Sequence, residues 1–228
     1  MRMSSEKAAA LEHFTLGNRY KEQGQYDHAV AEYLEALRQD GHLAEAYNNL
    51  GIVYKHLGQH DKAIEAYQEA LLRINPDLSQ AHDNLGVVYI EMGLTDEAIT
   101  AFHKAIETNP NNPKAYHNLG AAYENKGLYE NAVHAYNQAI QLDPTLMEAF
   151  NNLGIIYGRM NAYDWSIEAF KKAIELTPHD AELHFNLGLT YRKKGMMEEA
   201  IREYEEAIWI LPDFKEARKN LAVLKERR

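Results

Sequence analysis

Histidine and carboxylate side chains are the first candidates for metal binding or catalysis, but they form no recognisable motif. His56 and His60 are four residues apart, yet Gly58 places a turn between them and no carboxylate is fixed nearby. Three other histidines share one recurring position, where packed or surface side chains are the simpler interpretation: His13, His82 and His184. The sequence also has no phosphate-binding loop, dinucleotide fingerprint or nucleophile elbow. We therefore expect no catalytic residue, no metal and no cofactor, and the chain is not predicted to be an enzyme.

Asparagine is the polar residue that recurs most regularly. The string Asn49-Leu50-Gly51-Ile52-Val53-Tyr54 returns in similar form from four later asparagines, which are Asn84, Asn118, Asn152 and Asn186. A side-chain amide offers both a hydrogen-bond donor and an acceptor, which is what a peptide group of any sequence requires. The row therefore has two interpretations. The amides could bind the backbone of an extended peptide, or they could stabilise contacts between repeats.

Pairs of helices must position these residues, because the landmarks around them follow helical spacing. The framework glycines recur every 34 or 35 residues, as Gly17, Gly51, Gly86, Gly120, Gly154 and Gly188. Each leads a small residue 12 positions on, an aromatic residue four further and an alanine three beyond that. These offsets place the landmarks on one face of each of two helices. A turn glycine separates the two helices in five repeats, and proline closes five repeats.

Glycine inside a helix needs a compensating contact, because each one costs about 0.5–1 kcal/mol relative to alanine. We expect the missing Cβ to let the first helix approach the small residue of the second helix. These small residues are Ala29, Ala63, Ala98, Ala132, Ser166 and Ala200. Aromatic rings from both helices would fill the remaining space.

The pattern of Leu-Gly-x-x-Tyr, Ala, aromatic, Ala and Pro resembles the tetratricopeptide repeat (TPR) family over residues 10 to 214. The resemblance implies an all-α fold, a right-handed superhelical solenoid of antiparallel helix pairs forming a single domain over residues 1–228. The expected repeats are 10–43, 44–78, 79–112, 113–146, 147–180 and 181–214, followed by a capping helix at 215–228. Repeat two carries one extra residue, which should lengthen or bulge its second helix.

The resemblance also implies that the first helices line a concave groove for a peptide. With the framework glycine as position 8, the groove residues at position 6 are Asn49, Asn84, Asn118, Asn152 and Asn186. This row resembles the asparagine ladder in the repeat domains of protein O-GlcNAc transferases. Position 5 would tune specificity through Asn48, Asp83, His117 and Asn151, and position 9 offers an apolar stripe of Ile52, Val87, Ile155 and Leu189. The stripe could instead only pack against neighbouring helices.

Basic residues and tryptophans suggest two further surfaces. Arg159, Arg192 and Lys193 stand at positions 12 and 13, where they could hold an acidic segment or a carboxylate, or form a solvated rim. Trp165 and Trp209 occupy second-helix positions that are polar in several other repeats. They are a candidate outer interaction surface. Since Asn161 replaces the turn glycine of repeat five, local repacking around Trp165 is the plainer alternative.

Charge and composition limit the partners. The 228 residues include 34 acidic and 24 basic side chains, and the net charge of −10 would repel nucleic acid and anionic lipid. The absence of cysteine excludes disulfides and thiol nucleophiles and fits a reducing compartment. No apolar run approaches the roughly 20 residues needed to span a bilayer, and the N-terminus lacks a signal-peptide pattern. We expect a cytoplasmic protein with no nucleic-acid partner and no membrane insertion.

The leading functional hypothesis is a scaffold or adaptor that binds an extended or helical segment of a partner protein. A second hypothesis is a self-assembling homo-oligomer. A third hypothesis, suggested by the asparagine ladder, is the substrate-recruiting arm of a transferase-type complex. These residues contain no transferase domain of their own. The sequence does not indicate which protein the partner is.

Overall fold

The computed structural model describes residues 5–73 and 78–226, and within these residues it contains helices and no strand. This confirms the predicted all-α class. The helices of this described part are α1 (Ser5–Glu22), α2 (Tyr26–Gln39), α3 (Ala44–His56), α4 (His60–Arg73), α5 (Ser79–Glu91), α6 (Thr95–Thr108), α7 (Pro113–Asn125), α8 (Tyr129–Leu142), α9 (Met147–Arg159), α10 (Tyr163–Leu176), α11 (Ala181–Lys194), α12 (Met197–Ile210) and α13 (Lys215–Glu226).

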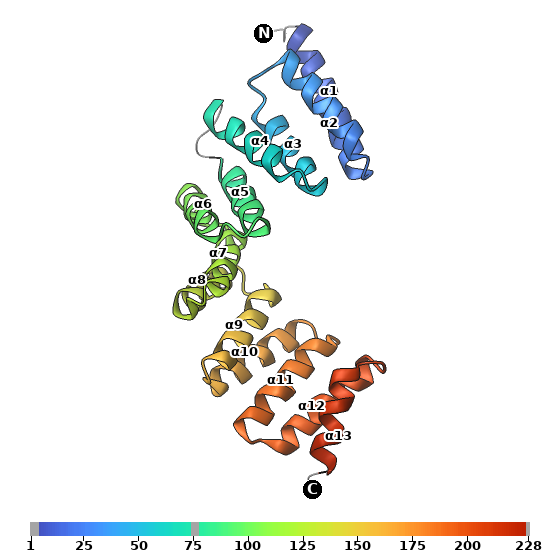
Figure 1. The fold of residues 1–228 in the computed structure, drawn as a ribbon, viewed down its shortest axis with the longest axis vertical. Helices are drawn as coiled ribbons and strands as arrows, with labels where there is room; N and C mark the ends of the chain where they lie inside the picture. The colour runs from blue at the N-terminus through green and yellow to red at the C-terminus, as the bar shows by residue number, and fades with distance from the viewer. Residues whose placement is uncertain (1–4, 74–77, 227–228) are drawn as a thin grey trace. The chain divides into compact units, whose positions relative to one another are not determined.

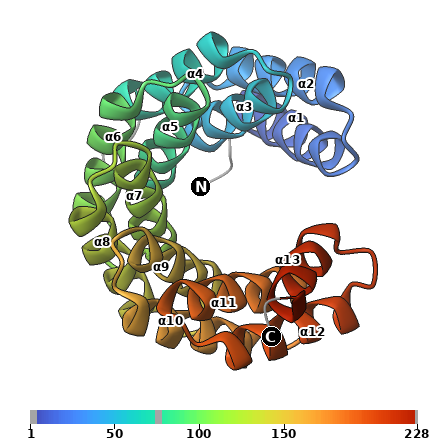
Figure 2. The same cartoon turned by 60° about the horizontal axis from the view of Figure 1, so that its bottom comes forward.

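The chain divides into two compact units, Met1–Ala122 and Tyr123–Arg228, with the boundary inside α7. Consecutive helices pack against one another within each unit, as the ribbon in Figure 1 shows. In the first unit, α3 and α5 lie on one side and α4 and α6 lie on the other (Figure 2). Neighbouring first helices also contact each other directly, α1 with α3 and α3 with α5 in the first unit, and α9 with α11 in the second. Each unit is thus a stack of helix pairs.

The turn inside each pair uses one repeated hydrogen-bonding geometry. In repeat two, Gly58 adopts φ 69° and the backbone N–H of Gln59 donates to the carbonyl oxygen of Tyr54 at 2.9 Å. A left-handed residue is the standard way to end a helix and satisfy its last carbonyls, and glycine adopts it without strain. Asn161 adopts φ 60°, and Ala162 donates to the carbonyl oxygen of Tyr157 at 2.8 Å. The turn of repeat five therefore keeps the common geometry although its glycine is absent.

The framework glycines make room for an aromatic ring of the second helix. A Cβ built on Gly86 would lie 2.4 Å from Cε1 of Phe102, and one on Gly51 would lie 2.5 Å from Cε1 of Tyr67. The same ring contact occurs at three other framework glycines, which are Gly17, Gly154 and Gly188. The predicted approach to the small residue is also seen, since the Ser166 hydroxyl donates to the carbonyl oxygen of Gly154 at 2.6 Å and a Cβ on Gly188 would lie 3.3 Å from the carbonyl oxygen of Ala200. The small residues are fully buried, as Ala29 and Ala132 illustrate.

Two predicted departures from the repeat pattern lie at the end of α4 and at the C-terminus. Helix α4 is described for 14 residues as far as Arg73, and a lengthening beyond Arg73 would fall at residues 74–77. A bulge at residues 74–77 would lie outside the described residues. At the C-terminus, α13 packs on α12 and buries only Ala217 and Leu224 among its described residues. It therefore presents a mostly charged outer face, as expected of a cap.

Candidate functional site

The asparagine row of the first unit begins with a contact between α1 and α3. The side-chain Nδ2 of Asn49 donates to Oδ1 of Asn18 at 2.8 Å, and the hydroxyl of Tyr33 donates to the same oxygen at 2.7 Å. Burial raises the pKa of Tyr33 to about 12, partly offset by the Asn49 amide. The hydroxyl is therefore a donor at neutral pH. Asn18 joins two helices of its own repeat to the next repeat, and sequence reasoning did not assign it this part.

The next two asparagines repeat the contact with a different acceptor. Nδ2 of Asn84 donates to Oδ1 of Asn48 at 3.2 Å, and Nδ2 of Asn118 donates to Oδ1 of Asp83 at 2.9 Å. Position 6 of one repeat thus bonds to position 5 of the preceding repeat. Asn48 and Asp83 are buried, while Asn84 and Asn118 are half-buried. Each donor amide uses one side-chain N–H within the protein. Its other hydrogen-bonding groups are a second N–H and the carbonyl oxygen.

Asp83 is a buried carboxylate at the centre of this row. Burial raises the pKa of Asp83 above its ordinary value, and the Asn118 hydrogen bond, Lys114 and His117 act in the opposite direction. His117, the position-5 candidate of repeat four, therefore lies close enough to influence this carboxylate. Asn48 and Asp83, at position 5 of repeats two and three, thus share one role, since each accepts a hydrogen bond from the asparagine of the next repeat.

In the second unit, the asparagine row makes a contact with a tyrosine of the second helix. Nδ2 of Asn152 donates to the hydroxyl of Tyr136 at 3.2 Å, and that hydroxyl donates to Oε2 of Glu124 at 3.4 Å. Arg159 forms an ion pair with Glu124, with Nη1 and Oε1 3.0 Å apart. The charge of Arg159 is therefore balanced within the protein, which weakens the expectation that Arg159 alone holds an acidic ligand.

The C-terminal end of the row differs because, among the described residues, Asn151 and Asn186 form no hydrogen bond to each other. The side-chain oxygen of Asn151 is buried and accepts no hydrogen bond in the described structure. No side-chain bond of Asn186 is found among residues 5–73 and 78–226. Arg192 donates from Nη1 to Oδ1 of Asn220 on α13, and Asn220 also donates to the carbonyl oxygen of Glu216 at 2.8 Å. Asn220 follows Asn186 by 34 residues, so the repeat period could have identified it.

The position-9 stripe is partly buried in both units. Ile52 packs against the core of repeats two and three, which includes Tyr67 and Leu85. Ile155 and Leu189 pack against the core of the last repeats. Val87 has intermediate exposure. These side chains therefore support helix packing and still expose part of their apolar surface beside the asparagines.

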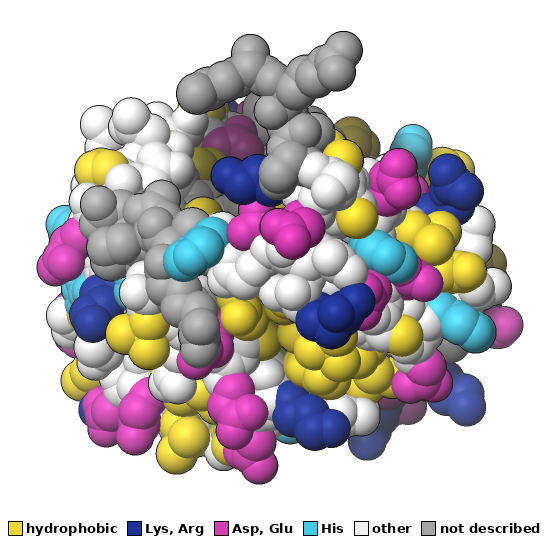
Figure 3. Space-filling view, turned by 90° about the horizontal axis from the view of Figure 1, so that it is seen from above, with side chains coloured by type: hydrophobic (Ala, Val, Ile, Leu, Met, Phe, Trp, Pro, Cys, Tyr) yellow, Lys and Arg dark blue, Asp and Glu magenta, His cyan; other side chains and the backbone are white. Residues whose placement is uncertain are grey.

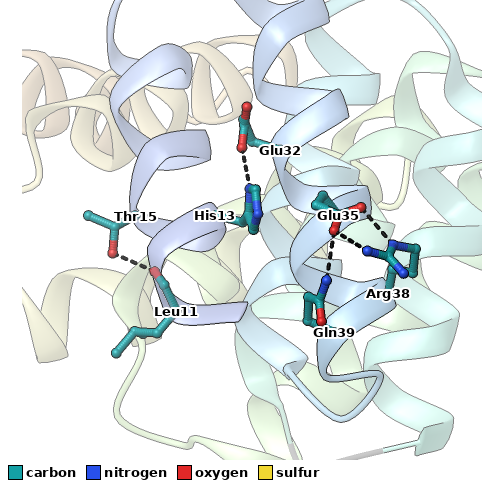
Figure 4. Close-up of polar contacts among 7 residues, drawn as sticks. All are labelled: Leu11, His13, Thr15, Glu32, Glu35, Arg38 and Gln39. Carbon is teal, nitrogen blue, oxygen red and sulfur yellow. Dashed lines mark hydrogen bonds and ion pairs between the residues drawn. The ribbon is translucent and has the colours of Figure 1, made fainter. Parts of the chain in front are cut away.

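Two of the position-4 histidines, His13 and His184, pair with carboxylates of the second helix. Nδ1 of His13 lies 2.7 Å from Oε2 of Glu32, as Figure 4 shows, and Nδ1 of His184 lies 2.7 Å from Oε2 of Glu203. Nε2 of His184 also lies 3.2 Å from the carbonyl oxygen of Pro178. Two acceptors facing both ring nitrogens favour the doubly protonated ring. The Glu203 hydrogen bond accordingly raises the pKa of His184.

Figure 4 also shows the surface network of repeat one. Glu35 accepts from Arg38 Nη2 at 2.6 Å and from Gln39 Nε2 at 2.8 Å, and these bonds lower its pKa to about 2. Thr15, the position-6 residue of this repeat, donates to the carbonyl oxygen of Leu11 at 2.7 Å within its own helix. The asparagine contacts between repeats thus start at Asn49.

Other candidate chemistry is not supported in the described part of the chain. No group of three or more histidine, aspartate or glutamate side chains that could hold a metal ion occurs there. None of the described helices is both long enough and apolar enough to cross a membrane. On the face drawn in Figure 3, acidic and basic side chains are interspersed and hydrophobic side chains show between them.

The two tryptophans are exposed on second helices of the second unit. Trp165, at the start of α10, is 67% exposed and its ring lies 6.2 Å from that of Tyr157. Trp209, near the end of α12, is 69% exposed and its ring lies 6.3 Å from that of His179. Neither indole is packed into the core, so both remain available for contacts with another molecule.

Comparison with known families places the chain in the tetratricopeptide repeat family. Models described as "Tetratricopeptide repeat" match residues 42–111, and also 113–146 and 181–214. A model described as "TPR repeat" matches residues 17–58 and 160–195. The chain therefore belongs to the tetratricopeptide repeat family, as the glycine period indicated. A search of curated proteins found no match.

Solved structures share this fold. PilF of Pseudomonas aeruginosa has 16% identity and a TM-score of 0.80, with 96% of this chain and 99% of that chain covered. YrrB, described as a TPR protein with an unusual peptide-binding site, has 23% identity and a TM-score of 0.70 over 82% of this chain and 96% of that chain. MamA has 29% identity and a TM-score of 0.69 over 75% of this chain and 92% of that chain. These structures show the fold, and membership of the tetratricopeptide repeat family supports a protein-interaction scaffold.

Proposed function

We propose that this protein is a scaffold or adaptor that binds an extended or helical segment of a partner protein along its first helices. The observation that carries the proposal is the row of half-buried amides on successive first helices of the first unit: Asn49, Asn84 and Asn118. Each is held by a hydrogen bond of 2.8 to 3.2 Å to the preceding repeat. Fixed amides need little reordering when a ligand binds, so less binding free energy is lost.

The chemistry of the row suits a peptide backbone. Each held amide offers a carbonyl oxygen and a second N–H, which can accept from and donate to peptide groups of any sequence. Val87 and Ile52 lie one helical turn from the asparagines and expose part of their surface, so apolar side chains of the ligand have a place to pack. YrrB, which has the same fold, is described as having a peptide-binding site.

The same contacts give the asparagines a structural role as well. Removing the Asn84 or Asn118 amide would leave a buried acceptor without its donor, at a cost of about 1–3 kcal/mol. In alanine variants of these asparagines, a loss of binding could therefore not be distinguished from a loss of stability. Val87 makes a better probe, since its half-exposed side chain lies beside Asn84 and takes part in no hydrogen bond between repeats.

Site-specific photo-cross-linking tests this proposal. A photoreactive phenylalanine analogue replaces Val87 on α5 in one variant and the exposed Thr100 on α6 in the matched control. We expect the Val87 variant to cross-link one partner segment from cell extract and the Thr100 variant to cross-link it weakly or not at all. Partner cross-links from Thr100 alone would place binding on the second helices and overturn the proposal.

A self-assembling scaffold is the alternative, and the mass of the protein in solution distinguishes it. The charged outer face of α13 disfavours stacking of copies at that end. Sedimentation that gives one monomer mass across a hundredfold range of concentration, on the order of 1 to 100 μM, would exclude self-assembly in this range.

A further inference from the structure

An open hollow of about 720 Å³ lies at one end of the last repeats. It is lined by the loop between α10 and α11, by the start of α11 and by the end of α12. Pro178, Ile210 and Leu211 supply apolar surface, and Leu211 is 47% exposed. The asparagine row does not contribute to this surface, so binding here is independent of the proposed function.

His179 lines this hollow, and its ring lies beside the ring of Trp209, so Trp209 is at the border of the hollow. Trp209 is the penultimate residue of its second helix. The equivalent residues of the other repeats are Arg38, Leu72, Glu107, Gln141 and Glu175. None of these is aromatic, so the repeat framework does not require an indole here. An exposed indole is a surface on which another group can stack.

The charges in the hollow have one sign. Asp180 and Glu182 contribute two carboxylates, and the lining residues include neither lysine nor arginine. Glu182 is exposed and forms no ion pair within the described residues. Oδ1 of Asp180 accepts from the backbone N–H groups of Glu182 at 2.9 Å and Leu183 at 3.2 Å. The first N–H groups of α11, which would otherwise attract an anion, are therefore already occupied.

We propose that this surface, the Trp209 hollow, binds a lysine or arginine side chain of a partner protein. The cationic head would lie over the indole of Trp209 and near the Glu182 carboxylate, and the methylene stem would pack on Leu211. Cations are attracted to the faces of aromatic rings, tryptophan most strongly, and arginine can also stack on them. An apolar floor beside an unneutralised carboxylate suits a side chain with an aliphatic stem and a charged end.

Trp165 provides an internal control because it is equally exposed without the same charge environment. Its exposed fraction is 67%, against 69% for Trp209. The neighbouring carboxylate of Asp164 accepts a hydrogen bond from Lys194, so it already has a cationic partner. A ligand that recognises any exposed indole would bind both tryptophans, whereas the proposed cation would prefer Trp209.

Nuclear magnetic resonance can read both sites at once, since the chain has two tryptophans and hence two indole N–H signals. The full chain is titrated with acetyl-Gly-Arg-Gly-amide, and with matched peptides in which norleucine or glutamate replaces the arginine. We expect a saturable shift of the Trp209 signal with the arginine peptide alone. Glu182→Gln should weaken this binding by about twofold to fivefold, as for an exposed ion pair.

A second variant tests the ring. Trp209→Leu keeps an apolar side chain but removes the indole, and the backbone N–H signal of Leu211 then reports binding. We expect the arginine peptide to lose its saturable effect. Equal shifts with the norleucine peptide would show a merely apolar surface, and a response to the glutamate peptide would show an anion site. Equal shifts at Trp165 and Trp209 would show non-specific contact with indoles, and each of these three results overturns the proposal.

Discussion

The side chain of Asn118 donates a hydrogen bond to the buried carboxylate of Asp83, with Nδ2 and Oδ1 2.9 Å apart. This contact joins α7 to α5 and has the same form as the Asn84–Asn48 contact between α5 and α3. The row of asparagines is therefore part of the framework as well as a candidate binding surface.

Replacement of Asp83 by asparagine should stabilise the protein at neutral pH. Burial raises the pKa of Asp83, so the folded protein binds this proton more tightly than the unfolded chain and is disfavoured when the group ionises. Asp83→Asn keeps an oxygen for the Asn118 donor and removes the charge. Its gain in free energy of unfolding should be largest at pH 7 and shrink as the pH falls through the folded pKa of Asp83. Urea unfolding at several pH values measures this, and a loss of stability at pH 7 would contradict it.

Replacement of Gly86 by alanine should destabilise the protein although alanine favours helices. The new Cβ would lie 2.4 Å from the ring of Phe102, so the ring or the helix must move, at a cost of about 1–3 kcal/mol. Gly41→Ala is the matched control, because its Cβ would meet nothing closer than 3.6 Å. Thermal and urea unfolding compare the two. A stabilised Gly86→Ala protein, as helix propensity alone would give, argues against the ring contact.

Replacement of Asn161 by alanine should destabilise repeat five. Asn161 adopts φ 60°, and a left-handed alanine costs about 1–2 kcal/mol, whereas glycine adopts this conformation freely. Both Asn161→Ala and Asn161→Gly remove the oxygen that accepts from the Tyr163 hydroxyl, so their difference isolates the backbone effect. Equal stability of the two variants would show that the turn does not require a left-handed residue.

The His184–Glu203 pair should make stability depend on pH. Its hydrogen bond raises the folded pKa of His184, so its contribution is complete below the unfolded pKa of about 6.5 and is lost as the pH rises through the folded pKa. Glu203→Gln should lower the free energy of unfolding by on the order of 1 kcal/mol at about pH 5.5 and by less at about pH 8.5. Glu206→Gln is the control, since Glu206 acts on His184 only through its charge. Equal losses for Glu203→Gln at both pH values would contradict this account.

The sequence predicted the helix pairs well because the repeat period records which face of each helix is buried. Helices α3 and α5 begin at Ala44 and Ser79, the residues at which the second and third repeats were expected to begin. Side-chain partners were less predictable, since they depend on how one repeat stacks on the next. Periodicity placed Gly86 on the buried face but could not show that the Phe102 ring lies over it.

The candidate site was predicted as a set of positions and not as a set of contacts. The sequence predicts that Asn84 and Asn118 either bind a peptide or stabilise contacts between repeats, and in the structure both donate to the preceding repeat. Both asparagines bond to position 5, a pattern that a single sequence does not reveal. Asn220 was missed because Ala222 and Lys225 of the cap stand where the repeat has Gly and Tyr, although Asn220 keeps the period of 34.

Calorimetric titration of the cross-linked partner segment tests the central claim most directly. The segment is titrated into the wild-type protein, into Val87→Arg and into Thr100→Arg, which add the same side chain to the first-helix surface and to the exposed surface of α6. We predict that Val87→Arg weakens binding by about tenfold or more and that Thr100→Arg changes it by less than about twofold. Unchanged affinity for Val87→Arg, with weakened affinity for Thr100→Arg, would contradict binding along the first helices.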